Sequence, residues 1–251
     1  MYSKDSFDVA TVETVIKIVE LLLEKTSSSD VMSSEEFLMN DTPMIPILNT
    51  AAQYCEGEKE TERELMDIYS NLYDIYVFRG EFEKGLEYTR KSLDIANKSD
   101  VVEYKAEATL LCANAAMSCA LGLASGIIES AKAEEGELSV PESIEDKAIE
   151  FINLVVDYSH EAYLLYLKLA LDGAIGLGLV DASLSEKLDD ENILETVGTL
   201  SSSLEQAERT DDVMMIINHL ETAVEMNEKV GFIDELIMNS AQSMMELALL
   251  N

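Results

Sequence analysis

The chain has 251 residues, with 50 acidic and 17 basic side chains that give a formal net charge of −33. Its hydrophobic content of 47% is ordinary for a globular protein and excludes disorder along the whole chain, and its length permits one large domain or two small ones. A surface this acidic repels nucleic acid and anionic lipid, so we expect neither a nucleic-acid partner nor a membrane partner.

The acidity itself has a general and a specific interpretation. In general, it suits a salt-rich cytoplasm, where about 1 M salt screens charges beyond roughly 3 Å, or it favours solubility. The specific interpretation is attraction to a basic partner, because a surface of one sign steers partners of the opposite sign. We therefore expect a protein or peptide partner, basic under the specific interpretation.

The three cysteines, Cys55, Cys112 and Cys119, are widely spaced and form no CxxC pair. This pattern predicts neither a disulfide framework nor a zinc site. Cys112 and Cys119 lie seven residues apart on one face of a predicted helix, where we expect small core residues. The first residues lack the basic stretch and apolar run of a secretory signal, so we expect a cytoplasmic protein.

Apolar residues recur at helical spacing along nearly the whole chain, and no stretch shows sustained strand alternation. The first predicted helices are 5–25, a short one leading to Cys55, 61–79, 82–97 and a long segment from 99 to about 134. Pro43 and Pro46 should break any helix in their own stretch. Thr61 and Glu64 form a capping-box signature, and Gly80 supplies the left-handed residue that ends the same helix.

The predicted elements beyond residue 99 contain several breaks. We expect one near Leu121-Gly122, because an unbroken rod would exceed about 50 Å. After a loop at 135–141, the predicted helices are 143–159, one through Leu171, 192–209, 211–229 with Gly231 as its stop, and 232–250. The Gly-rich run 173–178 loosens the chain, and 181–191 is expected to be a surface loop. The total is about eleven helices with short connections, which pack as antiparallel neighbours.

The segment Ala108–Ile128 has no charged residue and is long enough to cross a membrane. However, it is diluted by alanine and by polar residues, and its flanks show no positive-inside asymmetry. Ser118, Gly122 and Gly126 recur every four residues and would let another helix approach closely. We therefore favour a buried central helix over a membrane span.

One helix pair, near residues 66–97, has a characteristic pattern of aromatic, small and aliphatic residues. Its positions are Tyr69, Leu72, Tyr76, Gly80, Phe82, Gly85, Thr89, Ser92 and Ile95. The pattern resembles a tetratricopeptide repeat, and it departs from that family at Tyr73, Thr89 and Asn97. A weaker match lies near 197–229. Its positions are Leu200, Leu204, Ala207, Asp211, Ile216, Leu220, Ala223 and Met226.

The resemblance implies an all-α fold, a right-handed superhelical stack of antiparallel helix hairpins whose concave groove binds peptide segments. The expected organisation is a single helical-repeat domain over 1–251, within which 1–58 could form an N-terminal subunit and 60–251 the repeat array. The alternative is an irregular helical bundle with one chance match. The function implied is that of a non-catalytic adaptor or scaffold for protein partners.

Six of the 17 basic residues lie within 27 positions of the clearer repeat. They are Arg79, Lys84, Arg90, Lys91, Lys98 and Lys105. As a functional patch they would receive an acidic peptide end, another subunit or a phosphate. As a solvated face they would pair with the interleaved Glu81, Glu83, Glu87 and Asp94, which we favour. The predicted partner contacts are Tyr69, Asn71, Tyr73, Arg79, Arg90 and Lys91.

No residue set predicts catalysis, a metal site or a cofactor. His160-Glu161 lacks the second histidine of an HExxH motif, and one Asp157–His160 pair is too little for a di-iron bundle. The acidic pairs Asp189-Asp190 and Asp211-Asp212 lack a third acid, and the second pair more simply caps a helix. We therefore expect no enzyme. The alternatives are a helical-bundle enzyme that uses acidic residues and a metal ion, and a homodimer formed through the apolar C-terminal helix.

Overall fold

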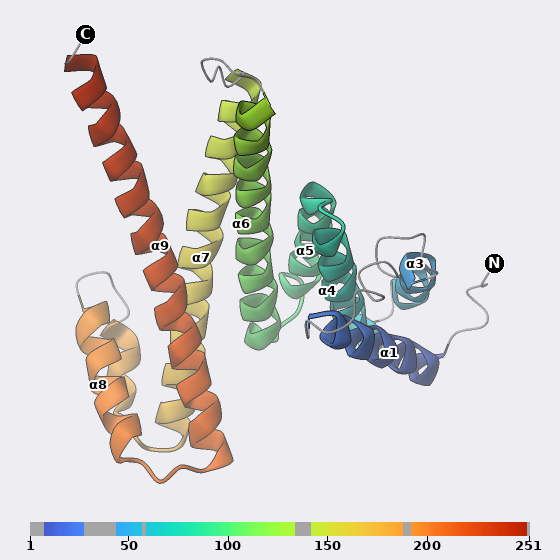
Figure 1. Ribbon diagram of the computed structural model, residues 1–251. Helices are drawn as coiled ribbons and strands as arrows, with labels where there is room; N and C mark the ends of the chain where they lie inside the picture. The colour runs from blue at the N-terminus through green and yellow to red at the C-terminus, as the bar shows by residue number, and fades with distance from the viewer. Residues whose placement is uncertain (1–7, 28–43, 57–58, 134–141, 188–191, 250–251) are drawn as a thin grey trace. The chain divides into compact units, whose positions relative to one another are not determined.

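The computed structural model describes residues 8–27, 44–56, 59–133, 142–187 and 192–249, and every regular element in these ranges is helical (Figure 1). The eight α-helices in these ranges are α1 (Val9–Ser27), α3 (Met44–Cys55), α4 (Glu62–Phe78), α5 (Phe82–Ala96), α6 (Val102–Ala133), α7 (Glu142–Gly176), α8 (Ile193–Gln206) and α9 (Asp211–Leu249). Two 3₁₀ helices, η2 (Lys59–Thr61) and η3 (Ala182–Lys187), precede α4 and α8. The predicted all-α class is confirmed for these residues.

The predicted number of about eleven helices was wrong for the described residues, because three expected breaks do not occur. Helix α6 is 32 residues long and is unbroken at Leu121-Gly122. Helix α7 is 35 residues long and is unbroken at residue 159, and α9 is 39 residues long and is unbroken at Gly231. A glycine inside a helix costs only about 1 kcal/mol, which neighbouring helical residues and packing can outweigh. At Gly122 the absence of a side chain makes room for the ring of Phe82, which a Cβ at this position would overlap.

Two local expectations near α3 and α4 were also wrong. Pro46 lies in the first turn of α3, where the missing N–H has no helical partner to lose. Thr61 is the N-cap residue of α4, but its side chain makes no capping hydrogen bond. Its hydroxyl instead donates to the carbonyl oxygen of Cys55, 3.1 Å away, so the expected capping box is not formed. The left-handed turn at Gly80 is confirmed, with φ of 71°.

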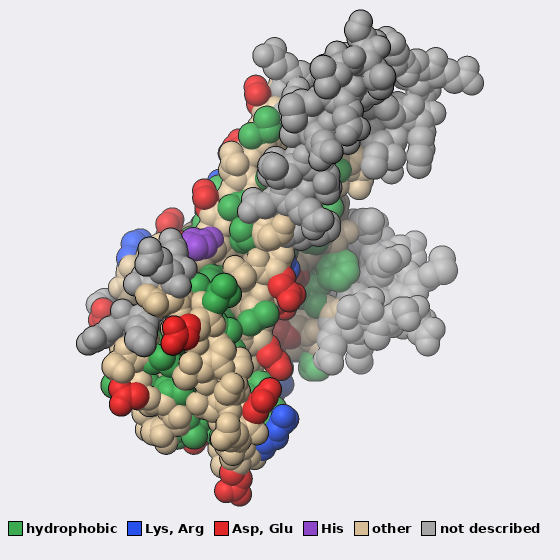
Figure 2. Space-filling view, turned by 90° about the vertical axis from the view of Figure 1, so that its left-hand side faces the viewer, with side chains coloured by type: hydrophobic (Ala, Val, Ile, Leu, Met, Phe, Trp, Pro, Cys, Tyr) green, Lys and Arg blue, Asp and Glu red, His purple; other side chains and the backbone are tan. Residues whose placement is uncertain are grey.

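The chain divides into two compact units, Met1–Val155 and Val156–Asn251, with the boundary inside α7. We call them unit 1 and unit 2. The expected repeat domain over 1–251, its N-terminal subunit 1–58 and its repeat array 60–251 stay predictions. Figure 2 shows one face of the molecule, on which acidic side chains lie among hydrophobic ones.

Helix α4 is the centre of unit 1, since it packs against α1, α3, α5 and α6. Its Ile68, Leu72 and Ile75 are fully buried and join Val12 of α1 and Leu48 of α3 in one apolar cluster. Full burial of such a side chain contributes about 1.5–3 kcal/mol to the stability of the fold. The residues of α4 that are spaced by four and three positions therefore form its buried face. The core thus holds α4 against α1 and α3, with Tyr88 and Ile95 of α5 packed on it.

Helix α6 packs extensively on α5, through a face of small residues. Cys112, Ala115, Ala116 and Cys119 are among its buried positions, as expected for the two cysteines. By length and composition, Val102–Gly126 is the one stretch of the described residues that could cross a membrane, with a mean hydropathy of 1.5. Within the structure, 39% of its most apolar window is buried.

Unit 2 consists of the second part of α7 together with η3, α8 and α9. Leu167 and Leu171 of α7 are fully buried, as are Leu200 of α8 and Ala223 of α9. A Cβ at Gly173 would lie 2.8 Å from the side chain of Ile216, so this glycine lets α7 and α9 approach closely. The predicted loosening of the chain occurs only after α7 ends, at Gly178 with φ of 69°.

The predicted homodimer contact depends on apolar residues near the C-terminus. They are Leu236, Met244, Leu247 and Leu250. Their side chains lie outside the residues whose side chains the structure describes. The predicted loop at 135–141 and the acidic pair Asp189-Asp190 also lie outside the described residues. These expectations stay predictions.

Candidate functional site

The weaker of the two predicted repeats forms the hairpin of α8 and α9. Its apolar template positions are buried as a hairpin core requires. They are Leu200, Leu204, Ile216, Leu220, Ala223 and Met226. Thr210 precedes α9 and accepts a hydrogen bond from the N–H of Val213 at 3.3 Å, while Asp211 and Asp212 lie in the first helical turn. The capping hydrogen bond is therefore accepted by Thr210 and not by the acidic pair expected to cap this helix, whose carboxylates are favoured in the first turn by the helix dipole.

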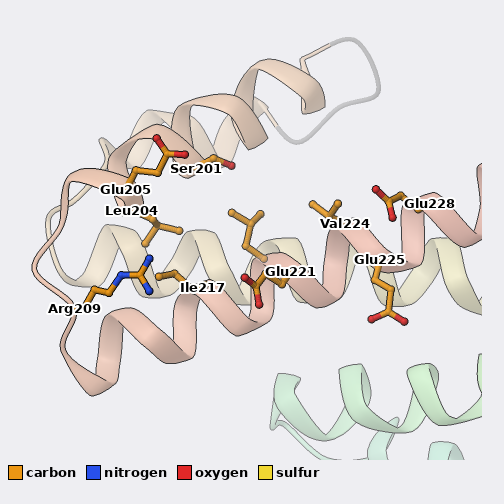
Figure 3. Close-up of a pocket in the computed structure, with 10 residues that line it drawn as sticks. Ser201, Leu204, Glu205, Arg209, Ile217, Glu221, Val224, Glu225 and Glu228 are labelled. Carbon is orange, nitrogen blue, oxygen red and sulfur yellow. The ribbon is translucent and has the colours of Figure 1, made fainter.

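A groove of about 400 Å³ lies between α8 and α9 (Figure 3). Leu204 from α8 and Ile217, Leu220 and Val224 from α9 supply its apolar side chains. Leu204 and Leu220 are buried, whereas Val224 is 37% exposed. The groove therefore offers accessible apolar surface that the hairpin does not use for its own core, a common property of binding sites.

Charged side chains surround this apolar floor, and most of them are acidic. Glu205 comes from α8 and Glu221, Glu225 and Glu228 come from α9, whereas Arg209 lies in the connection between the helices (Figure 3). All of these charged residues are exposed. The four carboxylates and one guanidinium give the groove a negative potential, so it would favour a cationic ligand.

The clearer predicted repeat forms the hairpin of α4 and α5, in which the two helices approach closely. A Cβ at Gly85 would lie 3.1 Å from Cδ2 of Tyr73, and Thr89 and Ser92 are also buried on α5. Small residues at the positions of Gly85 and Ser92 are what the sequence pattern predicted, whereas Thr89 departs from it. The hairpin is closed as a result, with its facing side chains in contact.

Three of the six predicted partner contacts are buried in this hairpin. The exposed fractions of Tyr69, Asn71 and Tyr73 are 6%, 4% and 8%. These side chains belong to the core of unit 1, and the structure leaves them little surface to offer a partner. For the two tyrosines the reason is non-local, because Tyr69 packs in the apolar cluster that α4 shares with α1 and α3, and Tyr73 lies against Gly85 of α5. Arg79 is partly exposed and Arg90 and Lys91 are exposed, so their partner contacts stay predictions.

Tyr69, Tyr76 and Tyr88 form a connected set of rings that we call the tyrosine ladder. Tyr88 of α5 lies 5.5 Å from Tyr76 and 5.8 Å from Tyr69, measured between ring centroids, and it stacks on Tyr76. Its hydroxyl donates to Oδ1 of Asn49 in α3 at 3.3 Å. Burial and the nearby Glu56 carboxylate raise the pKa of Tyr69 to about 12, so its hydroxyl stays protonated at neutral pH.

Three of the six residues of the predicted basic patch, Arg79, Lys84 and Lys91, contact groups of the same hairpin. Arg79 lies 2.9 Å from Glu81, which also pairs with Lys84. The ammonium of Lys91 lies 4.4 Å from the ring centroid of Tyr88 and 5.8 Å from that of Tyr69, within range of cation–π attraction. This supports the interpretation of these residues as a solvated, salt-bridged face.

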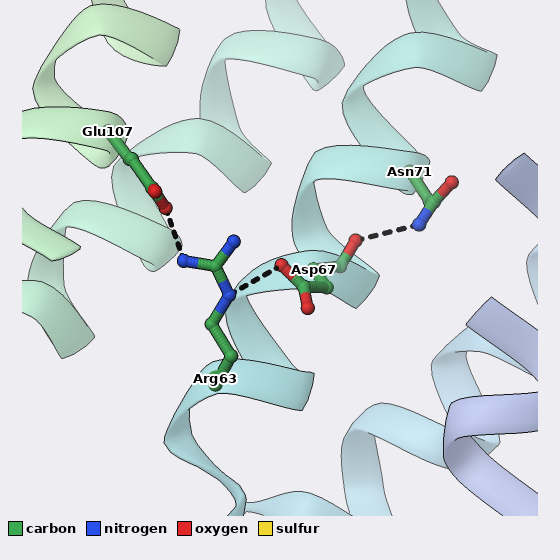
Figure 4. A network of polar contacts seen from close by, with 4 residues as sticks. All are labelled: Arg63, Asp67, Asn71 and Glu107. Atoms are coloured by element: carbon green, nitrogen blue, oxygen red, sulfur yellow. Dashed lines mark hydrogen bonds and ion pairs between the residues drawn. The ribbon is translucent and has the colours of Figure 1, made fainter. Parts of the chain in front are cut away.

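Asn71 belongs to a polar network that joins α4 to α6 (Figure 4). Its side-chain amide donates to the carbonyl oxygen of Asp67 at 2.9 Å. The Asp67 carboxylate lies 3.1 Å from Nε of Arg63, and the same guanidinium pairs with Glu107 of α6. Burial raises the pKa of Asp67, opposed by Arg63. The network has a structural role, since its single cation holds carboxylates of two helices.

A second carboxylate on α4, Asp74, is also partly buried. Burial raises its pKa to about 6, far above its ordinary value of 3.8. Periodicity alone had not distinguished Asp74 from the solvated acids of the chain. A signal was its place seven residues after Asp67, on the same face of α4.

The two histidines considered for catalysis each lie near a tyrosine ring. His160 is exposed, with the ring of Tyr163 6.4 Å away, and His219 lies 5.9 Å from the ring of Tyr166. In the described residues no three His, Cys, Asp or Glu side chains gather as a metal ion would require. Burial raises the pKa of Cys119 to about 11, so its thiol is unreactive at neutral pH.

No family model matches this chain, and comparisons with curated proteins and with solved structures also found no match. The packed neighbouring helix pairs are compatible with a helical repeat. The groove between α8 and α9 is therefore the candidate site, on the strength of its own geometry and charge.

Proposed function

We propose that this protein is a non-catalytic, cytoplasmic adaptor that holds a segment of a partner protein between antiparallel helices. The observation that carries the proposal is the groove between α8 and α9, with accessible apolar side chains such as Val224 on its floor. Helix pairs with such grooves bind partner segments by burying the partner's apolar anchors. In this proposal, 66–97 and 197–229 are tetratricopeptide-like repeats of a superhelical stack.

The proposal assigns different roles to the two hairpins. The α4–α5 hairpin, whose tyrosines and lysines contact one another, stabilises the array. The α8–α9 hairpin binds the partner, because its floor and its rim are accessible. Each buried apolar anchor of a partner would contribute about 1.5–3 kcal/mol, so two or three anchors suffice for a specific but reversible complex.

Site-specific photo-crosslinking tests this function. A photoreactive amino acid is placed at Ser201, a half-buried residue of the groove, and in a second protein at Ser125, an exposed residue of α6. We expect the Ser201 position to crosslink one discrete protein from native lysate, and the Ser125 position not to crosslink it. Absence of any product at Ser201, or the same products from both positions, would contradict the proposal. Circular dichroism of both proteins verifies that the helices are intact.

A further inference from the structure

The acidic side chains that line the groove indicate the charge of its ligand. On α9, Glu221, Glu225 and Glu228 follow one another at i, i+4 and i+7 and therefore lie on one face of the helix. Glu225 pairs with Lys229 at 3.1 Å, whereas neither Glu221 nor Glu228 forms an ion pair with a described residue. Like charges at i and i+4 destabilise a helix by a few tenths of a kcal/mol, a cost that a cationic ligand would remove.

The apolar floor indicates the size of the occupant. Its apolar side chains on α9 run from Ile217 to Val224, and Glu228 extends the lining of the groove beyond them. The distance from residue 217 to residue 228 along a helix is about 17 Å, which is about three helical turns. A partner helix of this length presents apolar anchors at i, i+3 or i+4, and i+7, and its flanking positions then lie above the acidic rim.

The rim is also asymmetric along the groove. Arg209 lies at the end near the start of α9, and Glu228 lies at the opposite end (Figure 3). A helix carries partial positive charge at its N-terminus and partial negative charge at its C-terminus. The favourable orientation of an occupant therefore places its N-terminus near Glu228 and its C-terminus near Arg209, antiparallel to α9.

We infer that the α8–α9 groove binds a basic amphipathic α-helix of a partner protein, about three turns long and antiparallel to α9. This inference rests on the proposed adaptor function and adds the chemistry and polarity of the ligand. Leucine-type anchors enter the floor formed with Ile217 and Val224. Lysine or arginine side chains of the partner pair with Glu205, Glu221 and Glu228.

The test uses the full chain and a fluorescent synthetic helix with leucines at i, i+4, i+7 and i+11 and lysines on the flanking positions. The groove variant carries Glu205→Gln, Glu221→Gln and Glu228→Gln. The matched control carries Glu13→Gln, Glu87→Gln and Glu103→Gln, three exposed carboxylates outside the groove. Three rim pairs of roughly 0.5 kcal/mol each predict about tenfold weaker binding for the groove variant. The control should change binding less than about twofold, because its net charge is the same.

A peptide with the same composition but scrambled order tests whether the apolar face matters. We expect it to bind much more weakly, and we expect Val224→Gln to weaken the ordered peptide while leaving the scrambled one unchanged. Equal weakening by the groove and control variants would overturn the inference, since binding would then follow net charge alone. Equal binding of the ordered and scrambled peptides would overturn it as well.

Failure of this inference is distinguishable from failure of the adaptor function. If a peptide with glutamates in place of lysines binds as tightly, and Val224→Gln weakens it, the groove binds partners but the predicted charge of the ligand is wrong. If Ser201 crosslinks no protein and Val224→Gln affects no peptide, the adaptor function fails too. A spin label on the peptide's C-terminus should broaden the amide signal of Arg209 more than that of Glu228, and the reverse result would overturn the assigned polarity.

Discussion

The helix hairpins α4–α5 and α8–α9 differ in what lies between and beside their helices. In α4–α5, the absence of a side chain at Gly85 lets α5 approach Tyr73, and the tyrosine ladder connects the pair to Asn49 of α3. In α8–α9, the groove is lined by aliphatic and charged residues, and Val224 remains 37% exposed. One hairpin is closed by its own side chains, whereas the other leaves an accessible groove.

Charge follows the same division. In the closed hairpin, Glu81 pairs with Arg79 and Lys84, and the ammonium of Lys91 lies over the rings of the tyrosine ladder. In the open hairpin, Glu221 forms no ion pair with a described residue. The comparison teaches that the spacing of apolar residues predicts which helix faces are buried, while the side chains beside the helix crossing decide whether accessible surface remains between the helices.

The largest expected difference in stability between the two hairpins comes from the same substitution, glycine to leucine, made in each of them. Gly85→Leu places a side chain where a Cβ is already 3.1 Å from Tyr73, so overpacking should lower the free energy of unfolding by about 2 kcal/mol. Gly198→Leu in α8 adds a side chain at an exposed position with no atom within 4 Å of its Cβ. The gain in helix propensity should raise stability there by about 0.5–1 kcal/mol.

Urea unfolding followed by circular dichroism measures both changes in the full chain. Opposite signs at the two positions would support the contrast between a closed and an open hairpin. If Gly85→Leu were as well tolerated as Gly198→Leu, then the helices of α4–α5 would not be closely packed, and the comparison would fail at its starting point.

Local signals in the sequence predicted the positions of several elements. Gly80 marks a left-handed turn because only glycine adopts that conformation without strain, and the apolar spacing of Leu200 and Leu204 marks the inner face of α8. The expected breaks at Gly122 and Gly231 failed for the opposite reason. A glycine weakens a helix by about 1 kcal/mol but does not end it unless the chain also turns, and neither glycine has a positive φ.

The candidate site was harder to predict, because burial and accessibility depend on contacts between distant segments. We predicted that Tyr69, Asn71 and Tyr73 contact a partner, but all three side chains are buried within unit 1. A signal for the groove between α8 and α9 was present at Ile217 and Val224. These residues lie beside the template positions of α9 and make its apolar stripe wider than one hairpin contact requires.

Buried charge offers a second way to test the difference between the hairpins. Asp74 lies on α4 of the closed hairpin, where burial raises its pKa to about 6 from 3.8. Above pH 6 the folded protein carries a carboxylate that is more stable in the unfolded chain. Between about pH 4 and pH 6 the folded state binds more protons than the unfolded state, so stability falls as pH rises. The substitution Asp74→Asn should therefore raise the free energy of unfolding by about 2 kcal/mol at neutral pH and leave it unchanged below about pH 4.

Unfolding by urea at both pH values measures this gain, with Asp94→Asn on the exposed face of α5 as the control. The control should change stability little at either pH, because its carboxylate is solvated in both states. A gain for Asp74→Asn that is equally large in acid would show that the effect comes from packing and not from the charge.

The smallest expected effect tests whether the cations of the closed hairpin are satisfied within it. Lys91→Met removes an ammonium 4.4 Å from the ring centroid of Tyr88 and should lower the free energy of unfolding by about 0.5–1 kcal/mol. Arg90→Met removes the same charge from the adjacent, exposed position of α5 and controls for the change in net charge. If the two variants lost equal stability, Lys91 would act only through the net charge of the protein. Lys91 would then be as available to a partner as Arg90. The contrast between the closed α4–α5 hairpin and the open α8–α9 hairpin would in that case depend on the groove alone.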